Sequence, residues 1–327
     1  MRRLLIDVYV ANVETTAGAE SVIKETEVHR ESETEPETED SEDPLFGSIG
    51  LKFVMNEDGE SCAIAGRGTC TDAHIIIQTS WRGYPVTRIA EKAFFCDDTL
   101  TGLTIQTGVT SIGEIAFWGC HNLKSVSLPD GLTDIEDNAF FFCESLTSVT
   151  LPNSVRSMGK NAFSGCKSLS EFVIPEGMTS IPMALFSGSC NLSSVTIPST
   201  VTSIGERAFH NCQSLKSIVI PDGVTSIGER AFHNCYNLES IVLPDTLTDI
   251  AASAFCNCKS LKSIEIPKSV KTISTSVFLG CGKLDTFTFL GTVAEWKAVE
   301  KHSNWAQDIP ASYSVQCTDG SVKVRGE

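Results

Sequence analysis

The chain has 327 residues, of which 41% are hydrophobic and 20% charged, and its formal net charge at pH 7 is −16. So negative a charge makes DNA, RNA and acidic lipid unfavourable partners. The sequence has no apolar run of about eighteen residues, so we expect no membrane insertion of this chain.

Residues 1–46 are predicted to be an acidic, mostly disordered tail or linker. Residues 1–50 carry thirteen acidic and four basic residues, and subtracting these from the totals of 41 and 25 leaves 28 and 21. The run HRESETEPETEDSEDP, residues 29–44, has no aliphatic or aromatic side chain and repels itself. A solvated spacer is the simpler interpretation, and an acidic interaction motif is the alternative.

The first residues, MRRLLIDVYVANVE, resemble a signal peptide only weakly, because Asp7 interrupts a short apolar stretch. We expect at most a short strand at Leu4–Val10. Three alternatives stay open: the protein remains inside the cell, it leaves by another route, or an export segment lies upstream of this chain.

Residues 47–88 are predicted to form an N-terminal cap. Two strand-like runs flank the turn Asn56–Gly59, and HIIIQ leads through a second turn at Arg82–Gly83 to Val86–Ile89. Terminal units of stacked repeats must be atypical, because they cover the open end of the core. Cys62 and Cys70 lie across the first strand pair and form the strongest candidate disulfide of the chain.

Residues 89–289 contain nine copies of a 23-residue unit, and VTSIGERAFHNC occurs twice without change, at 201–212 and 224–235. A fixed period of this size is typical of a solenoid. A phenylalanine recurs in every copy, at Phe94, Phe117, Phe140, Phe163, Phe186, Phe209, Phe232, Phe255 and Phe278. A leucine follows each of them six residues later.

Each part of the unit predicts one local structure. L-x-x-V-x-L alternates like a half-buried strand, the following proline ends it, and V-T-x-I is a second short extended segment. Helix formers and apolar residues in G-E-R-A-F-H-N-C predict one or two helical turns. A single coil cannot bury its apolar side chains, whereas stacked coils bury them as continuous rows.

Two copies depart from the pattern. In the first copy, Cys96 stands one place early and Asp97 takes the position of the usual cysteine. Around Cys190, we interpret the pattern as one residue gained before the cysteine and one lost after it. Such slips are expected in a surface turn or bulge.

Residues 290–327 break the repeat and are predicted to form a C-terminal cap. Trp296 and Val299 indicate a short helix, and Tyr313 to Cys317 indicate a final strand.

The repeat resembles the BspA-like class of leucine-rich repeat proteins, and the resemblance extends from about Leu51 to the C-terminus. It implies a leucine-rich repeat solenoid, curved and right-handed, with a β-strand and a short helical turn in each coil, a parallel β-sheet on one face and caps at both ends. Trp296 and Trp305 would then cover the core. It also implies surface-associated adhesion or ligand binding without known catalysis, which is an analogy because fold does not determine function.

The cysteines allow three interpretations: buried reduced thiols, disulfides, or a metal site. Seven occupy one repeat position: Cys120, Cys143, Cys166, Cys212, Cys235, Cys258 and Cys281. Stacked coils would place their α-carbons about 5 Å apart, which a disulfide tolerates, but joining neighbours would disturb the stack. Buried reduced thiols are therefore the simplest interpretation.

Neither a metal nor a catalytic site is predicted. His210 and His233 lie beside Cys212 and Cys235, which is a ligand set that zinc accepts, but the duplication explains it without a metal. G-x-S-x-G, P-loop and H-E-x-x-H motifs are absent from the sequence. We therefore expect no enzymatic activity, no cofactor and no metal.

The candidate ligand-binding face consists of the outward positions of the predicted strand. These are Ser125, Ser127, Ser148, Thr150, Glu171, Val173, Ser194, Thr196, Ser217, Val219, Ser240, Val242, Ser263 and Glu265. They are mostly small and hydroxyl-bearing, with no aromatic residue, which favours weak multivalent contacts over a tight hot spot. The alternative is that they are only structural spacers.

We therefore predict a non-enzymatic binding or adhesion module that recognises protein or glycan and is displayed at the cell surface or secreted. The alternative is a cytoplasmic protein–protein interaction scaffold. The sequence does not indicate the oligomeric state.

Overall fold

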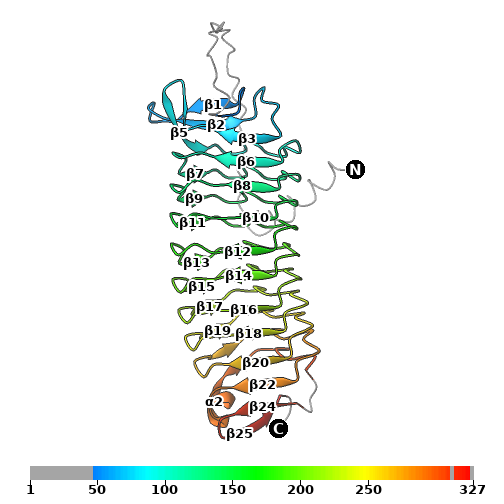
Figure 1. The fold of residues 1–327 in the computed structure, drawn as a ribbon. Coiled ribbons are helices and arrows are strands. Elements are labelled where there is room, and N and C mark those ends of the chain that lie inside the picture. The colour runs from blue at the N-terminus through cyan, green and yellow to red at the C-terminus, as the bar shows by residue number, and fades with distance from the viewer. Residues whose placement is uncertain (1–46, 310–312, 325–327) are drawn as a thin grey trace, which may run out of the picture. The chain divides into compact units, whose positions relative to one another are not determined.

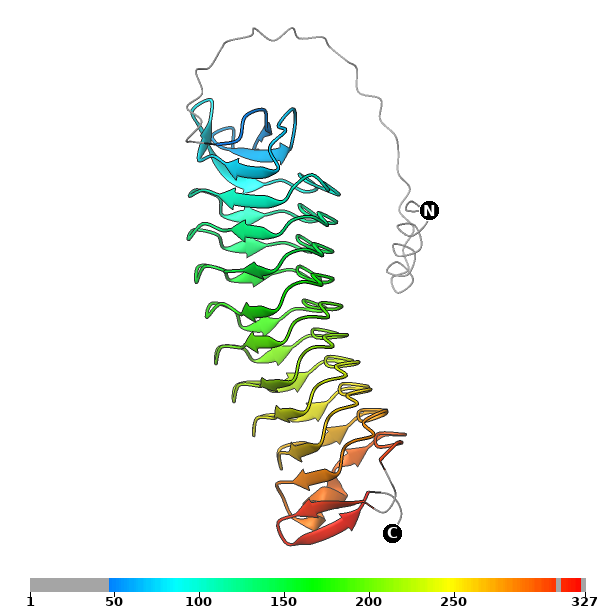
Figure 2. The same cartoon turned by 45° about the vertical axis from the view of Figure 1, so that its right-hand side comes forward.

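The computed structural model describes residues 47–309 and 313–324, so the predicted tail lies outside the described residues. This part of the chain forms a parallel β-solenoid of about ten coils, stacked in one column (Figures 1 and 2). The solenoid predicted from the 23-residue period is confirmed.

One strand of each coil belongs to a column that we call the front ladder, which has even labels in the repeats (Figure 1). It consists of β3 (His74–Ile77), β6 (Gly102–Ile105), β8 (Ser125–Ser127), β10 (Ser148–Val149), β12 (Glu171–Val173), β14 (Ser194–Thr196), β16 (Ser217–Val219), β18 (Ser240–Val242), β20 (Ser263–Ile266), β22 (Thr286–Phe289), β24 (Ser314–Cys317) and β25 (Gly320–Lys323). The strands pair within four separate groups, and these pairs are parallel except for β24–β25.

The second column, which we call the back ladder, has strands of two residues in the repeats. It consists of β1 (Lys52–Met55), β2 (Cys62–Gly66), β4 (Ser80–Trp81), β5 (Tyr84–Ile89), β7 (Ser111–Ile112), β9 (Asp134–Ile135), β11 (Ser157–Met158), β13 (Ser180–Ile181), β15 (Ser203–Ile204), β17 (Ser226–Ile227), β19 (Asp249–Ile250), β21 (Thr272–Ile273) and β23 (Glu300–Lys301). The pairs β1–β2 and β4–β5 are antiparallel, and the repeat strands pair in parallel one period apart.

The core is a stack of repeated side chains. All nine phenylalanines of the repeat are at most 2% exposed. The rings of Phe209 and Phe232 are nearly parallel, with centroids 5.1 Å apart and an interplanar angle of 6°. Burial of rows of phenylalanine, leucine, isoleucine and alanine supplies the main favourable free energy of folding.

The predicted helical turn in each coil is wrong. Among the described residues, the helix is α2 (Val293–Ala298), which lies outside the repeats. The G-E-R-A-F-H-N-C segment, which we call the turn segment, forms consecutive turns instead. The N–H groups of Arg207, Phe209 and Asn211 donate to carbonyls of the next coil at 2.8–2.9 Å, not to carbonyls four residues back.

Left-handed residues prevent a helix in the turn segment. Arg207 and Asn211 have φ angles of +54° and +60°, and the same two positions are left-handed in all nine copies. Glycine and asparagine adopt this conformation most easily, and seven of the nine copies carry one of them two residues after the phenylalanine. This periodic Gly or Asn was the signal in the sequence against a helix.

The slip predicted around Cys190 does not occur. Ser189 takes the cysteine position without a shift, is fully buried, and donates through Oγ to the Phe163 carbonyl at 2.9 Å. The Cys212 thiol donates in the same way to Phe186 at 3.3 Å. A small hydrogen-bonding side chain satisfies this position, so serine replaces cysteine and Cys190 occupies the next one.

The C-terminal end contains the predicted helix and strand. α2 begins at the capping box of Thr292 and Glu295 and carries the buried Trp296. The Trp296 ring lies 5.6 Å from Phe287 and 5.2 Å from Phe289, and 5.8 Å from Trp305. An aromatic cluster thus replaces the regular stack at this end.

Candidate functional site

The front ladder positions the candidate face by simple alternation. In β16, Ser217 and Val219 are exposed, whereas Ile218 between them is buried. A strand points successive side chains to opposite sides, so the inward isoleucine holds both neighbours outward. The structure exposes all fourteen candidate residues.

Parallel pairing places equivalent candidate residues side by side. Ser217 and Val219 of β16 pair with Ser240 and Val242 of β18. Thirteen candidates lie within front-ladder strands, and Thr150 follows the end of β10. The face therefore consists of a row of mostly serines beside a row of valine, threonine, serine and glutamate.

The valines are the most accessible apolar residues on this face. Val173, Val219 and Val242 are 63%, 67% and 59% exposed, more than any other large hydrophobic residue in the described part of the chain. Isolated exposed apolar residues are common on proteins. Here, however, they recur at one repeat position, and two of them are direct neighbours across strands.

The face is not one continuous sheet. Hydrogen-bonded pairing stops between β10 and β12, between β14 and β16, and between β18 and β20. Within the fragments, Glu171 and Val173 pair with Ser194 and Thr196. The structure therefore brings the candidates together as neighbouring groups along the column.

Residues that were not among the fourteen predicted positions extend the face at both ends. Thr104 of β6 pairs with Ser127, and its hydroxyl forms a hydrogen bond with Nε2 of His74 at 2.9 Å. At the other end, Thr286 and Thr288 of β22 pair with Ser263 and Glu265. The same 23-residue spacing could have identified all three threonines.

One edge of the face carries charges of alternating sign. The Lys262 ammonium lies 2.6 Å from the Glu239 carboxylate in the preceding coil. This hydrogen bond and the positive charges of Lys262 and Lys216 lower the pKa of Glu239. Both partners are about half exposed, so the pair contributes little to stability but keeps this edge close to neutral.

The cysteine row points into the core, away from the face. The Cys235 thiol donates to the carbonyl of Phe209 in the preceding repeat at 3.2 Å, and the other members of the row donate in the same way to the phenylalanine 26 residues earlier. Burial raises the pKa of Cys120 to about 12 and raises that of Cys212 well above its ordinary value. Such thiols are poor nucleophiles, since the thiolate is the reactive form.

All thirteen cysteines are free thiols in the structure. The candidate disulfide between Cys62 and Cys70 is not formed. Instead, Cys62 Sγ lies 3.6 Å and 3.7 Å from the carbonyl oxygens of Pro85 and Tyr84.

The two repeated histidines do not form a ligand set with the cysteines. The rings of His210 and His233 stack 5.1 Å apart, whereas Cys212 and Cys235 donate to core carbonyls. Burial, followed by the charges of His233 and nearby arginines, lowers the pKa of His210 to about 4. Within the described ranges, no three His, Cys, Asp or Glu side chains group as metal ligands would.

An open groove of about 450 Å³ lies over the back ladder, with Glu114, Asp134, Glu136 and Asp137 among its lining residues. Glu136 accepts a hydrogen bond from the Glu114 N–H, and Asp137 accepts one from the Lys160 N–H. Two carboxylates of this groove therefore already bind backbone N–H groups of the protein.

Among the described residues, no helix combines the length and apolar character needed to cross a lipid bilayer.

Comparison with known protein families identifies the repeat. Residues 87–201 and 179–299 match the family described as "BspA type Leucine rich repeat region (6 copies)". A comparison with curated proteins found no match.

The chain is similar to several solved structures. A leucine-rich repeat protein of T. pallidum is 28% identical, with 58% of this chain and 88% of that chain covered and a TM-score of 0.51. A leucine-rich cell surface protein of Faecalibacterium prausnitzii A2-165 is 26% identical over 80% and 99%, with a TM-score of 0.47. A leucine-rich repeat protein of Bacteroides ovatus is 22% identical over 80% and 92%, with a TM-score of 0.44. The family match spans more than half of the sequence, and the chain belongs to the BspA-type leucine-rich repeat family.

Proposed function

We propose that the front ladder is a non-enzymatic binding or adhesion face that recognises protein or glycan. The observation that carries this proposal is the exposure of all fourteen outward residues in two aligned rows. Membership of a leucine-rich repeat family supports protein binding in particular. Solenoid proteins use such extended surfaces for recognition.

The face suits contacts repeated along the column. Serine hydroxyls both donate and accept hydrogen bonds, and the exposed valines offer small apolar contacts. Without aromatic anchors, each contact contributes little, and affinity comes from several coils acting together. A ligand with its own repeated structure fits this surface best.

Binding to protein and glycan arrays tests the proposal with a matched pair of variants. Val219→Lys/Val242→Lys places two charges on the face, whereas Thr202→Lys/Thr225→Lys places them on exposed residues directly before the back-ladder strands β15 and β17 of the same two repeat units. We expect the first variant to weaken array binding by about tenfold or more and the second to leave it nearly unchanged. No binding by the wild type, or equal losses in both variants, would contradict the proposal.

We also propose that the protein is displayed at the cell surface, with residues 1–46 as an acidic spacer. The family resemblance and the composition of that segment support this location. Labelling of intact source cells with a membrane-impermeant reagent should modify the protein. Labelling only after lysis would instead favour the cytoplasmic scaffold.

The cytoplasmic scaffold remains the second candidate because of one observation. Thirteen free thiols, seven of them in one buried row, fit a reducing compartment. A free-thiol count on native and denatured protein tests whether the protein matures in an oxidising compartment. Thirteen thiols that react mostly after unfolding would fit either location, whereas extensive disulfides would favour secretion.

We further propose that residues 47–88 and 290–327 cap the two ends of the solenoid. The antiparallel pairs β1–β2 and β24–β25 interrupt the parallel stacking there, and Trp296 is 2% exposed against the last coils. If Trp296 closes the core, Trp296→Ala should expose apolar surface and increase binding of a hydrophobic dye. An unchanged dye signal and melting temperature would argue against a capping role.

A further inference from the structure

Both ladders are interrupted at the same place, between the coil of residues 143–165 and the coil of residues 166–188. We call this place the central junction. The front ladder lacks pairing there between β10 and β12, and the back ladder lacks it between β11 and β13. At the other two front-ladder breaks the back ladder continues unbroken from β13 to β23.

Pro182 explains the break in the back ladder. In neighbouring coils this position is Gly159 or Gly205, whose N–H groups donate to Ile135 and Ile181 one coil back, at 2.7 Å and 2.8 Å. Proline has no N–H, so the equivalent bond to Met158 cannot form. The sequence therefore removes one bond between coils at the central junction.

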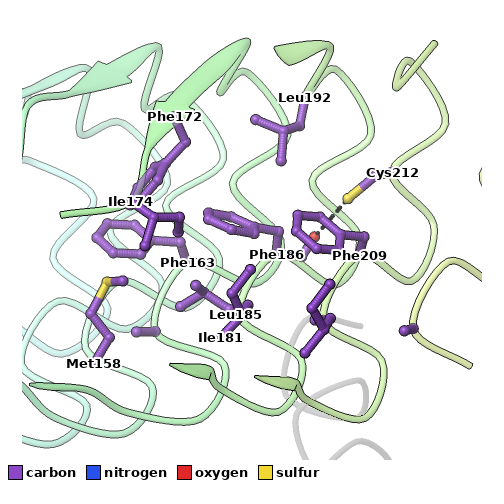
Figure 3. Packing of buried hydrophobic residues seen from close by; sticks show 14 of the residues in the cluster. Met158, Phe163, Phe172, Ile174, Ile181, Leu185, Phe186, Leu192, Phe209 and Cys212 are labelled. Atoms are coloured by element: carbon purple, nitrogen blue, oxygen red, sulfur yellow. Dashed lines mark hydrogen bonds between the residues drawn. The ribbon is translucent and has the colours of Figure 1, made fainter. Parts of the chain in front are cut away.

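The core also changes at the central junction. Phe172 occupies a position that is valine in the flanking coils, and its ring contacts those of both Phe163 and Phe186 (Figure 3). The centroid distances are 5.0 Å and 4.7 Å, and the interplanar angles are 61° and 68°. The parallel stack of the other coils is thus replaced by edge-to-face contacts around an inserted ring.

The turn segments keep the two coils connected on the third side. Asn161, Phe163 and Gly165 donate to backbone carbonyls of the next coil at 3.0 Å, 3.1 Å and 2.8 Å. One continuous row of hydrogen bonds beside two interrupted ladders has the geometry of a hinge.

We propose that the solenoid bends at the central junction, with the turn segments at residues 161–165 and 183–187 as the pivot. Each coil contacts only its neighbours, so the interface with the fewest bonds between coils is the most deformable. Bending tilts the candidate residues before the junction, such as Ser125, against those after it, such as Ser217. The inference concerns the mechanics of the column and does not depend on the proposed function.

Distance distributions in the full-length protein test the bend. Spin labels on noncanonical residues, which leave the native thiols untouched, are placed at positions 125 and 217, four coils apart across the junction. The control pair, 171 and 263, is also four coils apart but lies wholly after the junction. We expect the distribution across the junction to be about twofold wider than that of the control. Equal widths would overturn the proposal.

A repair variant identifies the cause of the bend. Phe172→Val/Pro182→Gly restores the residues of the flanking coils, and we expect it to narrow the 125–217 distribution to that of the control pair. A folded variant with an unchanged width would show that these residues do not create the hinge. If the variant does not fold, the wild-type comparison alone decides whether the bend exists.

Discussion

The duplicated coils of residues 201–235 and the central junction use the same 23 positions but differ in how neighbouring coils are joined. In the duplicated coils, Phe209 and Phe232 stack in parallel, and the Gly205 and Gly228 N–H groups donate to the preceding coil. At the junction, Phe172 separates two rings of the stack and Pro182 removes a donor. One fold therefore contains a stiff and a compliant interface.

A solenoid tolerates a change in the packing of one coil because each coil interacts only with its neighbours. β13 to β23 pair without interruption directly after the junction. Four experiments on single coils test how individual positions of the repeat contribute to stability.

The largest expected effect is on the regular stack. Phe209 is fully buried between Phe186 and Phe232, so Phe209→Ala should lower the free energy of unfolding by about 3–5 kcal/mol. Phe172→Val should cost less than about 1.5 kcal/mol, because valine is the residue of the flanking coils. Urea denaturation measures both, and equal losses would remove the distinction between the interfaces.

The second prediction concerns pH. The pKa of His210 is about 4 in the folded protein, below its ordinary value of 6.5, so the unfolded state binds more protons between these values. The contribution of the neutral His210 ring to the free energy of unfolding is fully present above pH 6.5 and is lost as the pH falls toward 4. Because the ring is partly exposed, we expect a loss of about 1 kcal/mol at pH 4.5.

The matched variant is His210→Ser/His233→Ser, since Ser164 and Ser187 occupy this position at the junction. Urea midpoints at pH 7 and pH 4.5 should differ less in this variant than in the wild type. An identical pH dependence would show that other groups titrate on unfolding.

The third prediction is a gain in stability. Ile115 has a φ of +60°, which a β-branched residue adopts only with strain. Ile115→Asn should therefore raise the free energy of unfolding by about 1 kcal/mol. Glu114→Asn, at the neighbouring exposed residue, is the control and should have almost no effect. A loss of stability in Ile115→Asn would mean that packing of the half-buried isoleucine outweighs the strain.

The smallest effect is expected on the candidate face. Ser217 is exposed, and the structure shows no side-chain hydrogen bond for it among the described residues, so Ser217→Ala should change stability by less than about 0.5 kcal/mol. Thermal denaturation checks this value. A loss as large as that of Phe209→Ala would mean that the inward and outward positions are assigned wrongly.

Much of the fold could be predicted because the same 23-residue pattern occurs nine times in the sequence. Alternation in L-x-x-V-x-L placed Ile218 inside and Val219 outside, as the structure confirms. The local spacing of residues gave a wrong prediction for the turn segment, where helix formers around Phe209 suggested a helix. There the N–H groups bond to the next coil, a partner 22 residues away that no local pattern contains.

The period, the inward and outward positions and therefore the residues of the candidate face follow from the amino-acid sequence alone, because periodicity decides which side chains a stack can bury. The connections of the turn segments, the serine at the cysteine position of residue 189 and the breaks in the ladders become visible only in the folded chain. These features depend on contacts between coils: the ring of Phe172 contacts the rings of Phe163 and Phe186, and the missing donor of Pro182 matters because Gly159 and Gly205 use that N–H to bond to the preceding coil.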